Sequence, residues 1–217
     1  MNRRLIAIAV ALGLVPLAGW AQTTQEVTYS GTTGGGSRSV VDSHGTPIPF
    51  GNEVEIGFFP GSFDVAGNAT TGIGSLQTLQ ANWHEFGSTL FRSFFPDNAP
   101  GEFAGDSTKT DASFNGQPIY MWIFETSDNL PPVTTGPNAF STVLEWGLYR
   151  STLASWAFPS TLAQFNNPVN ITTQDIDTRF FGQILAGNLE LSPVPEPTAL
   201  GLFGLGLAVV LGRRFRR

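Results

Sequence analysis

The chain has 217 residues and a formal net charge of −6, with 18 phenylalanines, 5 tryptophans and no cysteine. The lack of cysteine excludes disulfides and thiolate zinc sites, and the negative charge argues against binding the phosphate backbone of a nucleic acid. Aromatic and β-branched segments separated by glycine, proline, asparagine and aspartate are typical of strands, so we expect a mainly β fold.

The first 21 residues have the three parts of a secretory signal peptide. Arg3 and Arg4 precede an apolar run, and Ala21 ends a small-residue cleavage site. We expect cleavage after Ala21 and export of the remainder. The basic residues between 22 and 191 are Arg38, Arg92, Lys109, Arg150 and Arg179, against every acidic residue of the chain except Glu196. The exported body is therefore strongly acidic, and its length is that of one domain.

Period-two alternation and turn residues divide this body into strands. We expect strands at residues 25–30, 39–42, 53–59, 91–95, 116–124, 141–150, 155–158 and 182–191, with 39–42 continuing the pairing of the first strand. The tract 31–37 and the polar residues 101–110 are expected to be loops. The run 116–124 is apolar on both faces, which predicts a central strand between a second sheet and a helix.

The segment 53–59 alternates most clearly. Val54, Ile56 and Phe58 are predicted to face the core, while Glu53 and Glu55 face water.

One segment, 73–86, changes to helical spacing. Its apolar residues recur every three or four positions, and Gly87 is placed to stop the helix. A single helical turn is expected at Thr172–Asp175, where a Ser/Thr-x-x-acid pattern occurs. Together these elements predict a β-sandwich or jelly-roll-like body, residues 22–191, with one packed amphipathic helix.

Few residues of the body suggest catalysis or metal binding. His44 and His84 lack a nucleophile motif, so we expect neither to be catalytic. Glu53 with Glu55, and Asp175 with Asp177, are paired carboxylates that could serve hydrolysis or calcium, although neither pair has the spacing of a calcium loop. We predict no catalytic residue, no metal site and no cofactor.

Exposed aromatic rings would stack on sugars. Tyr149 and Trp156 are the candidates for a glycan contact if they face outward.

The last segment, 192–217, has three ordered parts. Pro195, Glu196 and Pro197 form an extended motif, since proline fixes the backbone and lacks a donor. An uncharged apolar run follows, with a transmembrane segment expected at about 198–212. Its length is marginal for crossing a bilayer. The chain closes on Arg213, Arg214, Arg216 and Arg217, which should stay on the cytoplasmic side.

This arrangement resembles the PEP-CTERM sorting signal of exopolysaccharide-producing bacteria. The resemblance implies recognition and cleavage by a membrane enzyme of the exosortase type, after export. It implies passage through the inner membrane and delivery to the cell surface or extracellular matrix, with exopolysaccharide as a further partner. We expect a structural or adhesive, non-enzymatic protein. The alternatives are a carbohydrate-binding module and a secreted polysaccharide hydrolase that uses carboxylates.

Overall fold

The computed structural model describes residues 24–31, 38–92, 99–159 and 168–195. Its elements are β1 (Gln25–Gly31), β2 (Ser39–Val41), β3 (Glu53–Phe58), α1 (Val65–Asn68), α2 (Ile73–Gln80), β4 (His84–Leu90), β5 (Phe103–Lys109), β6 (Tyr120–Thr126), β7 (Val143–Arg150), β8 (Val169–Thr172), β9 (Thr178–Phe181), β10 (Gln183–Ile184), β11 (Asn188–Glu190) and β12 (Ser192–Pro193). Short 3₁₀ turns lie at Ala112–Phe114 and Thr173–Asp175. The predicted mainly β class is confirmed.

The largest sheet has six strands, in the order β12-β7-β6-β3-β4, with β9 also paired to β7. β6 lies in its middle, antiparallel to both β3 and β7. The run that the sequence marks as a central strand is therefore central in the structure.

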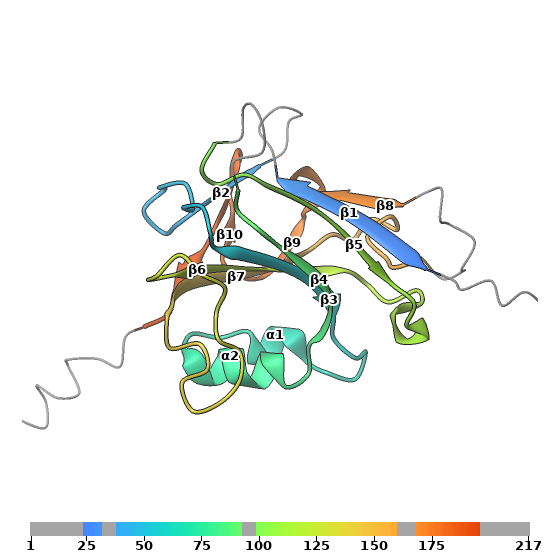
Figure 1. Ribbon diagram of the computed structural model, residues 1–217, viewed down its shortest axis with the longest axis horizontal. Helices are drawn as coiled ribbons and strands as arrows, with labels where there is room; N and C mark the ends of the chain where they lie inside the picture. The colour runs from blue at the N-terminus through green and yellow to red at the C-terminus, as the bar shows by residue number, and fades with distance from the viewer. Residues whose placement is uncertain (1–23, 32–37, 93–98, 160–167, 196–217) are drawn as a thin grey trace, which may run out of the picture.

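Two smaller sheets, β5-β1-β8 and β10-β11-β2, complete the strands of the described residues. Each contains one parallel pair, β1 with β8 and β2 with β11. Their apolar residues share the larger core with Ile119, Met121 and Ile123 of the β6 segment. In Figure 1 the sheet of β1, β5 and β8 lies across the molecule from the two helices.

The helices cover the other face of the six-stranded sheet (Figure 1). Leu76 and Leu79 of α2 are fully buried in the smaller core, which also holds Tyr120, Trp122 and Phe124 of β6. Alternate residues of β6 thus enter different cores, as the period of a strand requires. This explains why the run is apolar on both faces.

The predicted helix is too long. It ends at Gln80, and its apparent continuation turns at Asn82 into strand β4. Trp83 packs in the smaller core and Phe86 in the larger one, on opposite faces of the sheet. Their helical spacing is coincidental. Gly87 does not stop a helix: a Cβ there would overlap Ser107 of β5, so the glycine allows the two strands to approach.

The polar segment 101–110 is a strand and not a loop. β5 pairs with β1 over its whole length, from Gln25 with Lys109 to Gly31 with Phe103. It is an edge strand in which Phe103 is buried, while Asp106 and Thr108 are exposed. Such a strand carries little hydrophobic signal because backbone pairing holds it in place.

Other boundaries also differ from expectation. The predicted strand 155–158 is reduced to a bridge between Ala157 and Pro118, and 182–191 forms the hairpin of β10 and β11. β2 pairs with β11 instead of β1. Phe91 and Arg92 follow β4 outside any strand, and the rest of the predicted strand 91–95 lies outside the described residues. The turn at Thr173–Asp175 occurs as predicted.

Candidate functional site

The contacts of the two histidines are those of a turn residue and of a packed ring. His44 lies in the exposed turn after β2, where its Nδ1 is 3.9 Å from Asp42 and 3.4 Å from the hydroxyl of Ser43. That hydroxyl donates to Glu145 at 2.5 Å. His84 stacks on Phe58, with 4.6 Å between ring centroids. The Ser43 hydroxyl beside His44 is thus committed to a carboxylate, so these two residues do not form the nucleophile–base pair that activates a hydroxyl.

Glu55 is buried, contrary to the prediction that it faces water. It is 5% exposed and lies opposite Trp122 of β6, on the face of the sheet that α2 covers. Burial raises the pKa of its carboxyl to about 8, with smaller contributions from Glu53 and Glu85. Glu53 is less buried, and its pKa is also raised by desolvation. The two carboxylates are therefore not a pair of exposed groups, because Glu55 is buried on the face of the sheet that the helices cover.

Asp175 and Asp177 hold turns in place. Asp175 accepts from the hydroxyl of Thr172 at 3.0 Å, across the 3₁₀ turn. Asp177 accepts from the backbone of Thr152 at 2.9 Å and from the hydroxyl of Thr178 at 2.8 Å. The hydrogen bond from the Thr152 side chain is the main cause that lowers the pKa of Asp177. Both carboxylates thus accept hydrogen bonds that stabilise turns.

The structure brings together a carboxylate pair that sequence reasoning missed. Glu125 of β6 lies directly opposite Glu145 of β7. Desolvation, followed by the charges of Glu145 and Asp42, raises the pKa of Glu125 to about 7. Both strands were predicted, but their register was not, and register decides which residues face each other. Even so, the described part of the chain contains no group of three ligands that could hold a metal ion.

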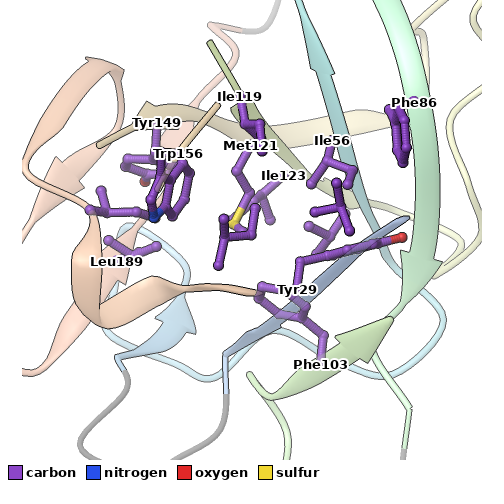
Figure 2. Packing of buried hydrophobic residues seen from close by; sticks show 14 of the residues in the cluster. Tyr29, Ile56, Phe86, Phe103, Ile119, Met121, Ile123, Tyr149, Trp156 and Leu189 are labelled. Atoms are coloured by element: carbon purple, nitrogen blue, oxygen red, sulfur yellow. The ribbon is translucent and has the colours of Figure 1, made fainter. Parts of the chain in front are cut away.

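Tyr149 and Trp156 are not at the surface. Their exposed fractions are 0% and 1%, and both pack in the larger core near Leu189 (Figure 2). The Tyr149 hydroxyl donates to the carbonyl of Glu190 at 2.6 Å. Neither ring is available to stack on a sugar.

The C-terminal segment begins as part of the fold. Ser192 and Pro193 form β12, paired with Trp146 and Glu145 at the edge of β7. Val194 donates its N–H to Leu144 at 2.8 Å, and its side chain is buried in the smaller core. Pairing therefore continues past residue 191, where the sequence places the end of the body. Pro195, the first residue of the Pro-Glu-Pro motif, is exposed and is the last residue described.

A cavity of about 300 Å³ lies at this exit. It is bounded by Ile73 of α2, by the start of β7 and by the departing chain, and its lining residues are Ile73, Ser141, Val143, Leu144, Glu145, Pro193, Val194 and Pro195. The sorting motif thus leaves the body beside a mostly apolar hollow at the margin of the helix layer.

Comparison with known families decides the nature of this end of the chain. A family model described as the PEP-CTERM protein-sorting motif matches residues 193–217. The chain carries a PEP-CTERM sorting motif. The motif indicates an exported protein that passes through the membrane and is sorted by an exosortase. No curated protein and no solved structure matches the chain.

The remaining predicted parts of both signals lie outside the described residues. These are the cleavage site at Ala21, the motif residues Glu196 and Pro197, the segment 198–212 and Arg213, Arg214, Arg216 and Arg217. Within the described ranges, no helix is both long and apolar enough to span a bilayer.

Proposed function

We propose that the chain is an exported structural or adhesive protein, delivered by its tail to the cell surface or an exopolysaccharide matrix. An exosortase-type enzyme cuts it at the membrane. The observation that carries this is the position of the motif: the family match starts at residue 193, and within the described residues the last backbone hydrogen bond to the body is made by Val194. Pro195, where the Pro-Glu-Pro residues begin, comes directly after the last strand of the described body and the buried Val194, a position suited to a sorting signal.

A non-catalytic role for the body is supported by what its polar groups do. Glu55 is covered by the helix layer, Asp177 holds a turn, and the Ser43 hydroxyl is bound to Glu145. In the described ranges these groups do not converge on the cavity beside the motif: of the residues just named, Glu145 alone is among those that line it. A hydrolase would have to use Glu125 and Glu145, which face each other on β6 and β7, but only Glu145 of this pair lines the cavity. A glycan-binding alternative would need aromatic residues other than Tyr149 and Trp156.

The motif itself is tested by replacing Pro195, Glu196 and Pro197 with alanine, glutamine and alanine in the producing cell. The variant should stay uncut in the inner membrane, because the enzyme loses its recognition sequence while the apolar run still anchors the chain. Pro131→Ala, which changes an exposed loop proline, is the matched control and should be processed normally. Release of the motif variant at the mature size would overturn the proposal.

A further inference from the structure

The layer that covers the smaller core is free of charge. In the sequence, no charged residue or histidine lies between Asp64 and His84, or between Asp128 and Glu145. These two stretches contain α1, α2 and the loop that joins β6 to β7. In a body as acidic as this one, two such long uncharged stretches form a distinct surface. We call residues 65–83 and 129–144 the helix-layer face.

The two stretches form one continuous surface. Val65, Leu76 and Leu79 from the first and Ala139, Phe140 and Val143 from the second bury their side chains in the same core. Ile73 of α2 and Leu144 at the start of β7 line the same cavity. Figure 1 shows the helices and the β6–β7 loop together on one side of the six-stranded sheet.

The helix-layer face exposes apolar side chains in that loop and at the exit of the tail. Leu130 and Val133 are each 58% exposed, and Leu144 is 45% exposed. Polar residues on the outer side of α2, such as Gln77 and Thr78, are neutral. By contrast, β1 and β5, across the molecule, carry Glu26 and Asp106.

The sorting tail leaves the body at this same face. Val194 is anchored in the smaller core, Pro195 is at the cavity, and the uncharged apolar run begins at Ala199. Four residues of fully extended chain reach at most about 14 Å. Once the apolar run is inserted, the exit point must therefore lie within about 14 Å of the hydrocarbon, about twice the thickness of one headgroup layer.

We propose that the helix-layer face is a membrane-facing surface whose occupant is the headgroup layer of the bilayer that holds the tail. This rests on the proposed function, since it requires the uncut tail to be inserted. Anionic headgroups repel an acidic surface within about a Debye length, close to 8 Å at physiological salt. A neutral face with exposed leucine and valine avoids that repulsion and buries apolar area in the interface. The short connection between Pro195 and Ala199 thus keeps the helix-layer face, which is neutral and partly apolar, next to the membrane.

The test uses the whole chain, exported and left uncut in a host without the sorting enzyme, then reconstituted into phosphatidylethanolamine–phosphatidylglycerol vesicles. Because the sequence has no cysteine, single labels can be placed at Gln77→Cys and Thr135→Cys on the face, and at Thr108→Cys on β5 as the control. All three positions are exposed. A headgroup spin label should quench the two face probes about threefold or more over the control, since an interfacial apolar face sinks some 5–10 Å into the headgroup boundary while β5 lies across the molecule (Figure 1).

A charge variant separates a lipid contact from mere proximity. Gln77→Glu with Thr135→Glu, read by a probe at Thr71→Cys, should lose most of this quenching at low salt and regain it at high salt. Thr108→Glu should leave the same probe unchanged. Face probes no more quenched than Thr108→Cys would overturn the inference while leaving the proposed function standing. Face probes that are shielded from the label at high protein density, and quenched only on dilution into lipid, would assign the face to a second copy, which also overturns it. Failure of the chain to float with vesicles would overturn both proposals.

Discussion

Val194 donates its backbone N–H to the carbonyl of Leu144, 2.8 Å away, and the residues on either side of it, Pro193 and Pro195, have no N–H to donate. Successive N–H groups along a strand point to opposite sides. The prolines therefore occupy the positions whose donors would point away from β7, toward solvent. The start of the sorting motif can dock on the sheet edge, while its open side offers another strand few donors.

We predict that this docking contributes measurable stability. A body of residues 22–191 should unfold at a lower urea concentration than one of residues 22–195. Its free energy of unfolding should be lower by about 1–2 kcal/mol, because it lacks a buried valine and an edge hydrogen bond. Both should give circular dichroism dominated by β structure. In the longer body, Val194→Asp should cost about as much as the truncation. Pro193→Ala should stay within about 0.5 kcal/mol, since the added N–H faces solvent. Equal stability of the two bodies would contradict the docking.

The buried Glu55 predicts a pH dependence of stability. Its carboxyl has a folded-state pKa of about 8 against an ordinary 4.5. Between these values the folded protein keeps a proton that the unfolded chain releases. Stability should therefore fall as pH rises from about 5 to 8. Glu125, with a pKa of about 7, acts in the same direction.

The corresponding variant is Glu55→Gln, which cannot ionise. Urea denaturation at pH 5, 6.5 and 8 should show a shallower decline than in the parent, with a gain of a few kcal/mol at most at pH 8. Glu26→Gln on β1 is the matched control and should keep the parental slope. If Glu55→Gln also keeps that slope, Glu55 does not bind the proton.

Tyr149 is predicted to be a packing residue whose hydroxyl has one specific partner. Tyr149→Phe should cost about 1–2 kcal/mol, because the Glu190 carbonyl loses the hydrogen bond it accepts. Gly182→Ala should cost more. Gly182 has φ +90°, and a Cβ there would overlap the Tyr149 hydroxyl. Gly187→Ala, with open space around the glycine, should change stability by less than about 0.5 kcal/mol. Denaturation midpoints of the three variants check the order, and a neutral Gly182→Ala would refute it.

Sequence patterning located the central strand and its two covers because both cores fill it with apolar side chains. Because both faces of these strands are apolar, the sequence does not show which core an aromatic side chain enters, or that it is buried. On β7, Leu148 enters the smaller core and Tyr149 the larger one. Alternation on a strand covered on both faces cannot indicate which residue is exposed.

Burial of Glu55 and pairing of Glu125 with Glu145 could not be predicted for a related reason. Both depend on which elements lie against a face and in what register, and neither leaves a local signal. The sorting motif was predictable because it is read as a linear sequence. Recognition of its Pro-Glu-Pro residues needs no tertiary contact, and the family match at 193–217 agrees with that prediction.

The last prediction separates retention from cutting. Replacing Arg213, Arg214, Arg216 and Arg217 with glutamine removes the charges that resist passage through hydrocarbon, each of which costs about 2.5–3.5 kcal/mol at the bilayer centre. The tail should then slip outward, so that uncut protein appears outside the inner membrane, although Pro195–Pro197 is intact. Replacing the same residues with lysine keeps the charge and should preserve retention and cutting. Membrane fractionation with immunoblotting for the full and mature sizes distinguishes these outcomes. A glutamine variant that is retained and cut like the parent would show that the apolar run alone holds the chain for the enzyme.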